Sequence, residues 1–551
     1  MDKQQSTKIY INTYRTFLRS KGKMAIDQIE GLYKQMCPSI HKKAHLEELD
    51  IEGFMYSYLR LPPEVHKVSK FVLGQTGDIF LRDGYKLDFW EPVSAPARRR
   101  KIFFDGEETM AVFINSVTDL DDIVGLLTAF SIEWNKMHKK LQSLNGRFDA
   151  KNIEKIRNVL GIDEENFKRL ERIFGENMAQ KLITISKIKV DFSIKLLRGN
   201  YVDYKKAAQR WFDHILNFTK QEDFVNRPIY FVSSNTHSLV NNITGFVTNI
   251  EQGLIGFLEE KKMTTLLDYW QNIQKGDHPG SKENFLWYVL KKYENENPSV
   301  KIEREKVEEK YGIENINAKH YLDINAQILS VKDIVDAPGV LKITKNTELL
   351  KSSNALILNI DYPLGSGAYM VLSTLFQNLS QLKGVYILGK ASFLHANIGD
   401  IGIPVKVYDT YTDNTFIIKN AFSQADFTEF QSGSVLSGQG VVSTKGTFLH
   451  PESVIESYFM KGYSLVEMED GPYLSAIYEA TNFSRYPERE IIELLDIPFD
   501  LGIIHYASDT PFTKAITLGT RNLGYEGVEA TYLSSLAILK RIIALNCDKV
   551  E

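Results

Sequence analysis

Cysteine is scarce in this sequence, since 551 residues contain only Cys37 and Cys547. Two cysteines supply no disulfide framework and no paired metal or redox motif, so we expect a reducing, cytoplasmic setting. The first residues are polar and lead into an amphipathic segment, which does not resemble a secretory signal. No stretch reaches the roughly 18 uninterrupted apolar residues of a membrane helix, so no membrane partner is predicted.

Excess charge of one sign is also missing. The 66 basic and 70 acidic residues leave a formal net charge of -4, which gives no field to attract nucleic acid or an anionic membrane. One basic run, Arg98 to Lys101, follows Pro96 and precedes an apolar segment. It is either the solvated end of a loop or a contact for an anion. No metal site and no cofactor are predicted.

The length exceeds what one hydrophobic core supports, and it suggests about three units. Apolar residues recur at helical spacing through the first half, with a few short β-like runs such as Lys101 to Phe104. We therefore expect a mainly helical domain over residues 1–145. Residues 146–317 should form a second helical domain, or a continuation of the first with a connector, and residues 318–551 an α/β domain.

One piece of the helical half has a different pattern. Residues 227–232 form an apolar, β-branched run that predicts a strand, and a polar stretch containing His237 then leads into a helix at Leu239. Small polar residues at a helix start are common caps, and they can also present donors to an anion. Both interpretations of His237 remain open.

After about residue 317 the pattern changes to short β-branched runs separated by glycine turns and helices. Helices are expected from Tyr369 to Leu382 and from Pro472 to Glu479. The expected buried strands are residues 355–360, 384–388, 403–408, 464–468 and 501–506. This alternation predicts a mixed sheet flanked by helices, with ligands gathering at the carboxyl ends of the strands.

Two glycine-containing segments follow predicted strands. Gly365, Ser366 and Gly367 lie between a strand and a helix, where glycine lets the backbone approach a ligand and the helix start favours a polar or anionic oxygen. The second segment runs through Gly389, Lys390, Ala391 and Ser392. Its lysine is either a solvated side chain or the charge that faces a phosphate or carboxylate.

Two acidic segments also end predicted strands. Glu467 and Glu469 flank Met468, and on a strand their side chains point to the same face. Two like charges there need donors, which ribose hydroxyls would supply, unless the pair is simply exposed. Ser508 and Asp509 end another strand, where the aspartate can act as a general acid or cap a turn.

In this order, the four segments resemble the superfamily of purine nucleoside phosphorylases, AMP nucleosidase, and methylthioadenosine and S-adenosylhomocysteine nucleosidases. The resemblance covers about 230 residues, and it includes Gly399-Asp400-Ile401 as a strand start. It implies a nucleoside phosphorylase-like domain in which Glu469 holds the ribose hydroxyls and Met468 packs on the sugar. Asp509 would protonate the leaving base. Phe448 matches the aromatic residue that stacks on the base.

The resemblance has clear departures. No arginine occurs between Arg304 and Arg485, so Lys390 and Lys445 are the local cations for a phosphate. No glutamate-rich motif on the first strand supplies a base for water. The sequence favours an N-glycosidic hydrolase for a purine nucleoside or nucleotide; the alternatives are a catalytically silent nucleotide sensor and a phosphate-dependent phosphorylase. Family members commonly assemble through this domain, so a homo-oligomer is implied.

Overall fold

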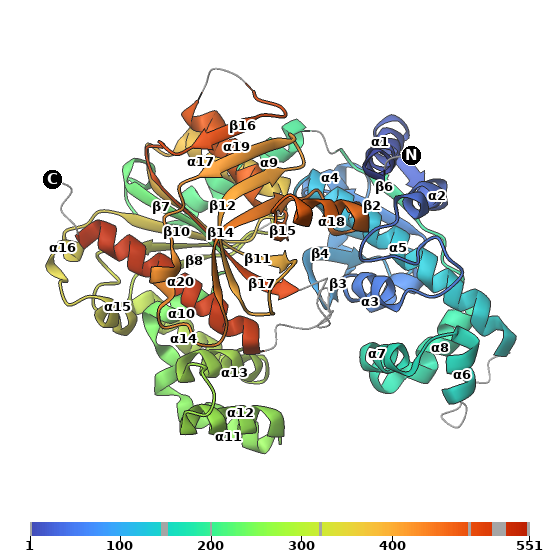
Figure 1. Ribbon diagram of the computed structural model, residues 1–551, viewed down its shortest axis with the longest axis horizontal. Helices are drawn as coiled ribbons and strands as arrows, with labels where there is room; N and C mark the ends of the chain where they lie inside the picture. The colour runs from blue at the N-terminus through green and yellow to red at the C-terminus, as the bar shows by residue number, and fades with distance from the viewer. Residues whose placement is uncertain are drawn as a thin grey trace.

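The computed structural model describes residues 3–144, 153–198, 201–318, 322–482, 486–509 and 525–547. Within these ranges the chain builds two β-sheets, one from the first 200 residues and one from the remainder. Figure 1 shows the two sheets and their helices side by side, with the blue N-terminal part next to the larger part that contains the C-terminus. No helix of the described residues is long and apolar enough to cross a membrane.

The N-terminal part contains a six-stranded sheet, in the order β1-β6-β2-β5-β4-β3. Its strands are β1 (Lys23–Ala25), β2 (Lys70–Gly74), β3 (Glu91–Ala95), β4 (Arg98–Phe104), β5 (Thr109–Phe113) and β6 (Ser193–Leu196). Strands β6, β2 and β5 run parallel to one another, and β4 runs antiparallel to β5.

The sequence predicted a mainly helical N-terminal half, and the sheet departs from that prediction. All five residues of β5 are buried, so its apolar run shows no alternation. Such a short buried strand cannot be distinguished by periodicity from a piece of a buried helix. The β-like run at residues 101–104 was the correct local signal, since it lies in β4.

Eight α-helices belong to the described N-terminal part. They are α1 (Lys3–Lys21), α2 (Asp27–Met36), α3 (Ile51–Leu59), α4 (Gly77–Arg82), α5 (Val117–Leu141), α6 (Ile153–Leu160), α7 (Glu164–Phe174) and α8 (Met178–Lys187). Of these helices α5 is the most buried, and α6–α8 pack on other helices and not on the sheet. Helix α5 begins where β5 ends, so its first turn lies at the carboxyl edge of the sheet.

The second sheet has eleven strands within the described residues. They are β7 (Pro228–Ser234), β8 (Ile313–Ile316), β9 (Ala326–Ser330), β10 (Leu356–Asp361), β11 (Gln381–Phe393), β12 (Ile401–Asp409), β13 (Asn414–Ile418), β14 (Val435–Ser443), β15 (Leu465–Glu467), β16 (Ile491–Leu494) and β17 (Asp500–Asp509). The six strands expected from apolar runs after residue 226 all coincide with strands of this sheet.

Strand β7 comes from residues 146–317, which we expected to form a second helical domain or a continuation of the first with a connector. It pairs in parallel with β10 on one side and with β11 on the other, so it lies inside the large sheet. Residues 318–551 therefore do not complete this sheet without a strand contributed from further back in the chain.

Both faces of the large sheet carry helices. Helices α9 (Tyr201–Phe218), α17 (Ser366–Asn378) and α19 (Asp470–Thr481) share one core with it, and α10 (Ser238–Thr244), α15 (Pro338–Ile343) and α20 (Tyr525–Cys547) share another. The remaining helices are α11 (Glu251–Glu260), α12 (Thr264–Lys275), α13 (Lys282–Glu296), α14 (Pro298–Lys310), α16 (Glu348–Lys351) and α18 (Glu452–Met460). In Figure 1 the helices α11–α13 project below the large sheet.

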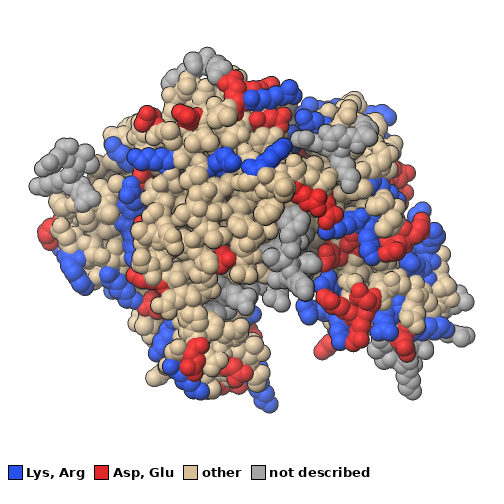
Figure 2. All heavy atoms as spheres, in the orientation of Figure 1, with Lys and Arg blue, Asp and Glu red and all other residues tan. Residues whose placement is uncertain are grey.

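In Figure 2 acidic and basic side chains both occur around the margins of the face and on its right-hand part, whereas the middle of the view shows mainly other residues.

Candidate functional site at the carboxyl edge of the large sheet

Glu467 ends β15 and holds the start of α19. Strand β15 pairs with β14 so that Ser443 lies opposite Glu467, and the Ser443 hydroxyl donates to one carboxylate oxygen. The other oxygen accepts the backbone N–H groups of Glu469 and of Asp470, the latter at 2.8 Å. The positive end of the helix favours such a carboxylate. Burial, together with the charges of Asp470 and Glu469, nevertheless raises the pKa of Glu467 well above its usual value.

Glu469 does not share a strand face with Glu467, as the sequence had suggested. The strand ends at Glu467, and Glu469 has φ −113° and ψ −33° at the N-cap of α19. The chain turns here because the backbone N–H groups of Glu469 and Asp470, at the start of α19, donate hydrogen bonds to the Glu467 carboxylate. The two carboxylates therefore point in separate directions from one turn.

Glu469 contacts the first glycine-containing segment. Its Oε1 accepts the backbone N–H of Gly365 at 3.0 Å, so two segments that are about 100 residues apart meet here. Gly365 has φ +52°, which favours glycine. Burial raises the pKa of Glu469 to about 7, against the opposing effect of the Gly365 hydrogen bond, and the Asp470 charge raises it further. Glu469 therefore changes its charge near neutral pH.

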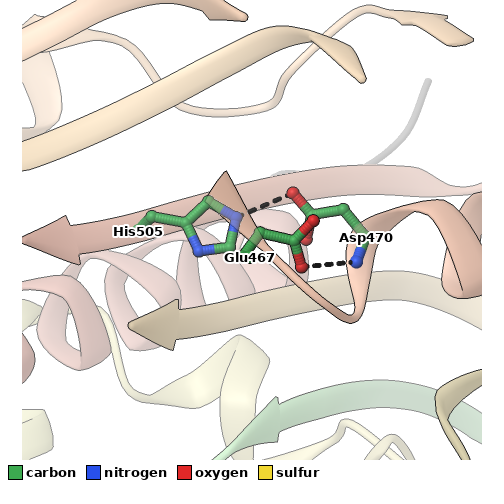
Figure 3. Close-up of side chains that lie close together, drawn as sticks. All are labelled: Glu467, Asp470 and His505. Atoms are coloured by element: carbon green, nitrogen blue, oxygen red, sulfur yellow. Dashed lines mark hydrogen bonds and ion pairs between the residues drawn. The ribbon is translucent and has the colours of Figure 1, made fainter. Parts of the chain in front are cut away.

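Asp470 and His505 form a buried pair, and neither residue was among the site residues that we expected from the sequence. The two residues are 0% and 1% exposed, and His505 Nε2 lies 2.7 Å from Asp470 Oδ2. Figure 3 shows His505 reaching from β17 toward Asp470 at the start of α19, with the Glu467 carboxylate beside them. Gly389 pairs with His505 in the sheet, and a Cβ at this glycine would lie 3.0 Å from His505 Nδ1. The second glycine-containing segment thus makes room for the histidine.

Glu467, Asp470 and His505 have the composition of a divalent-metal site, and one potential ligand atom from each lies within 4.8 Å of the others. Both oxygens of Glu467 already accept hydrogen bonds, however, and one oxygen of Asp470 pairs with His505. A cation bound through Glu467 would have to displace these bonds, whereas Asp470 Oδ1 and His505 Nδ1 complete no hydrogen bond within the described residues. The hydrogen bonds that engage both oxygens of Glu467 therefore disfavour a metal centre here.

The segment from Gly389 to Ser392 is part of a strand, because β11 continues to Phe393. Gly389 and Ala391 are buried and Lys390 is exposed, as expected for alternating side chains. The Ser508 hydroxyl donates to the backbone oxygen of Ala391 at 3.4 Å. The backbone of Asp509 pairs with Ser392, which brings the ends of β11 and β17 together. The side chain of Asp509 lies outside what the structure describes.

The glycine turn itself contacts the N-terminal half. The Ser366 backbone N–H donates to the Thr118 hydroxyl oxygen at 2.9 Å, and the hydroxyl oxygens of Thr118 and Ser366 are 3.0 Å apart. A Cβ added at Gly365 would lie 2.5 Å from Thr118, while Gly367 has more space. The hydroxyl of Thr118, in the first turn of α5, therefore accepts the backbone N–H of Ser366, which we had expected to bind a ligand.

Phe448 packs into the core of the N-terminal half. Its side chain is 2% exposed, and its ring lies edge-on to Tyr56 with the centroids 5.3 Å apart. Tyr33 is a second aromatic neighbour. A ring enclosed in this way has no face free for a base. Met468 is partly exposed next to Glu469.

A small cavity of about 60 Å³ lies between α1 and the loops of the large sheet, lined by residues that include Lys8, Thr410, Asp413, Lys445 and Tyr458. Burial and the neighbouring Arg15 lower the pKa of Lys445. The cavity lining contains one of the two lysines considered for a phosphate, and it includes none of the carboxylates described above.

The fold and site thus define a mixed α/β protein that buries a network of carboxylates and a histidine at the carboxyl edge of its large sheet. The chain belongs to the family of unknown function DUF6909, whose model matches residues 26–544. No curated protein matches it.

Several solved structures resemble part of the chain. One is a putative methylthioadenosine nucleosidase from Weissella paramesenteroides, with 12% identity over 42% of this chain and 89% of that one, at a TM-score of 0.28. Another is the 5′-methylthioadenosine/S-adenosylhomocysteine nucleosidase from Neisseria meningitidis, with 13% identity over 42% and 90%, at a TM-score of 0.28. A third is uridine phosphorylase isoform 2 from Schistosoma mansoni, with 10% identity over 61% and 93%, at a TM-score of 0.31.

Proposed function

We propose that this protein binds a purine nucleoside or nucleotide at the carboxyl edge of its large sheet and hydrolyses the N-glycosidic bond. The observation that carries the proposal is the contact between Glu469 and Gly365. It joins an acidic turn to a glycine turn, and the β11–β17 pairing brings Ser508 and the backbone of Asp509 to the end of the same sheet.

The chemistry assigned to each group follows from its charge. An ionised Glu469 accepts hydrogen bonds from two ribose hydroxyls, and it also steadies the positive charge that develops on the sugar as the bond breaks. Asp509 donates a proton to the leaving base, a solvent water bonds to the sugar carbon that the base leaves, and the proton that this water releases restores Asp509. Met468 supplies an apolar contact for the sugar. Binding that strengthens as the sugar becomes electron-poor accelerates departure of the base.

The Asp470–His505 pair acts as a positioning element. It is buried, it lies behind the turn that carries Glu469, and the charge of Asp470 contributes to the raised pKa of Glu469. We propose that this pair fixes the start of α19 and tunes the protonation of Glu469, without touching the substrate.

A second candidate function is a nucleotide sensor without turnover. The contact between Thr118 and Ser366 favours it, because a residue of the N-terminal half occupies the glycine turn. A ligand that displaced Thr118 would change the packing between the two sheets, which is what a sensor requires.

The test is to incubate the purified full-length protein with purine nucleosides and nucleotides, with and without phosphate, and to assay free base by chromatography. Base release without phosphate is the result expected of the hydrolase. Release only with phosphate would support a phosphorylase, and saturable binding without release would support the sensor. Absence of both binding and release would contradict the nucleoside proposal. The Glu456→Gln variant, which changes an exposed glutamate of α18, is the matched control for Glu469→Gln.

A further inference from the structure

The carboxyl edge of the N-terminal sheet carries a second group of buried polar side chains, here called the edge cluster: Gln75, Thr76, Arg98, Asn115 and Tyr204. The side chains of Gln75, Asn115 and Tyr204 belong to residues only 1%, 4% and 2% exposed. The guanidinium-bearing side chain of Arg98 is 5% exposed. The basic run that includes Arg98 is therefore not a solvated loop end at this position.

Strand pairing places these residues together. Gly74 ends β2 opposite Phe113, which ends β5, so Gln75 and Asn115 leave adjacent parallel strands at the same edge. Strand β4 runs antiparallel on the other side of β5, and its first residues, including Arg98 and Arg100, lie at that edge too. Tyr204 reaches the edge from α9. Burial raises the pKa of Tyr204; the nearby Gln75 amide opposes that rise and the Asp119 charge adds to it.

Several hydrogen-bonding groups of the edge cluster are unused. Among the described residues, none completes a hydrogen bond with Asn115 Nδ2. The Gln75 amide and the Tyr204 hydroxyl are close enough to influence each other, but neither completes a hydrogen bond within the described residues. The same holds, within the described ranges, for the Thr76 hydroxyl and for Arg98 Nε and Nη2. A buried unpaired polar group costs about 1–3 kcal/mol, so such a concentration at one edge needs a physical reason.

The acidic groups nearby are already engaged. Asp119 accepts the Arg100 Nε–H at 3.0 Å and the Asn115 backbone N–H at 2.8 Å. Asp122 accepts from Arg98 Nη1, and Arg98 Nη2 lies 3.7 Å from Asp119, beyond hydrogen-bond reach. Arg98 and Arg100 balance Asp122 and Asp119 in charge; of the other acidic neighbours, Asp121 binds Arg15, and Asp323 lies near Arg100 and Lys101. Most of the unpaired groups are hydrogen-bond donors, so a ligand that binds here must supply hydrogen-bond acceptors.

We propose that the edge cluster binds a small oxyanion, carried by a phosphate or carboxylate group. The free Nε and Nη2 of Arg98 form the fork that pairs with two oxygens of such a group. Amide donors from Gln75 and Asn115 approach from the neighbouring strands. Helix α5, which is 25 residues long, begins beside them and directs its positive end to the same edge. The Gln75 carbonyl oxygen suits a protonated oxygen of the guest.

The test uses the full-length protein and measures its thermal midpoint while inorganic phosphate, or in a separate arm acetate, replaces chloride at constant ionic strength. We expect a saturable rise with at least one of the two anions, and the arm that responds identifies the oxyanion. Gln75→Met should weaken the apparent affinity about tenfold, because a hydrogen bond to a charged group is lost. The same variant without anion should be at least as stable as the unmodified protein, since it removes an unpaired buried amide.

Arg98→Lys provides a second variant that keeps the charge and loses the fork, and it should weaken affinity similarly. Gln180→Met, at an exposed position of α8, is the matched control and should leave the shift unchanged. The shift should persist in Glu469→Gln, which separates this site from the proposed nucleoside site. Equal shifts in the unmodified protein, Gln75→Met and Arg98→Lys would overturn the proposal. So would crystals grown in phosphate that show only ordered water at the edge cluster.

Discussion

At the carboxyl edge of the large sheet Glu467 accepts three hydrogen bonds and Asp470 pairs with His505, whereas at the carboxyl edge of the N-terminal sheet the amides of Gln75 and Asn115 have unused groups. The difference follows from charge. Each buried ionised group has at least one strong partner, although Asp470 Oδ1, His505 Nδ1 and two nitrogens of Arg98 complete no hydrogen bond among the described residues. The neutral amides of Gln75 and Asn115 can be buried unpaired at a smaller cost. The carboxyl edge of the large sheet, here called the first edge, is therefore organised before a ligand binds. The carboxyl edge of the N-terminal sheet, the second edge, depends on a bound ligand to pair its amides.

The two edges meet through α5. Thr118 in its first turn binds Ser366 of the large sheet's glycine turn, and Asp119, the next residue, binds Arg100 of the N-terminal sheet. The Ser116 hydroxyl adds a bond to the backbone oxygen of Leu364 at 3.2 Å. One helix end thus touches both candidate sites.

The largest expected effect is on turnover, and it tests whether Asp509 acts as the general acid. Asp509→Asn should lower turnover of a purine nucleoside by about 100-fold or more, the range for loss of a general acid, with binding nearly unchanged. Steady-state kinetics and equilibrium binding measure the two quantities separately. Equal losses of turnover and binding would assign Asp509 a binding role, and no loss would remove it from the site.

A second prediction concerns how much the buried Asp470–His505 pair contributes to the stability of the protein. Asp470→Leu should reduce the free energy of unfolding by about 3 kcal/mol, because it leaves His505 without its partner. The double variant Asp470→Leu/His505→Leu should lose less than the sum of the two single changes. Urea denaturation measures these values, with Asp496→Leu at an exposed position as control. Additive losses would show that the pair is not energetically coupled.

The pH dependence of stability tests the raised pKa of Glu469. The folded protein holds this proton up to a pKa of about 7, while the unfolded chain releases it near 4.5, so the folded state binds more protons between those values. The contribution of Glu469 to stability is therefore complete below pH 4.5 and is lost as pH rises through 7.

The two pKa values set an upper bound of about 3 kcal/mol for this contribution, and partial exposure of the side chain reduces it. Glu469→Gln should flatten the stability profile across pH 4.5 to 7, whereas Glu456→Gln should not. Unfolding measured at a series of pH values provides the comparison. An unchanged slope in Glu469→Gln would mean that another group is responsible.

The smallest effect concerns the contact between the two halves. Thr118→Val should reduce stability by about 1 kcal/mol, because Ser366 loses its hydrogen-bond acceptor. It should also tighten nucleoside binding severalfold, since the hydroxyl that competes for the backbone N–H of Ser366 is gone while the size of the side chain is unchanged. Calorimetric binding would show this, with Thr264→Val at the exposed start of α12 as control. Weaker binding in Thr118→Val would instead place the hydroxyl within the nucleoside site.

The sequence was most informative about the large sheet, where buried strands of β-branched residues alternate with helices. The N-terminal sheet was not predicted, because its strands are three to seven residues long and β5 is buried throughout. At the site, Glu469 and Gly365 were both identified, although their direct contact needed coordinates. Asp470 and His505 were missed because 35 positions separate them and no motif joins them. A histidine within the apolar run of β17 was the available signal.

Phe448 shows the limit of carrying a role over by position. The sequence places it correctly before the acidic turn, yet the N-terminal core encloses its ring, and no pattern in residues 318–551 could reveal a partner located in residues 1–145.

A crystal structure of the Asp509→Asn variant soaked with a purine nucleoside tests the central claim most directly. We predict that the sugar hydroxyls lie within hydrogen-bond distance of Glu469, with the ligand against the Gly365 turn. A nucleoside bound elsewhere, or none at a concentration that saturates binding in solution, would contradict the account.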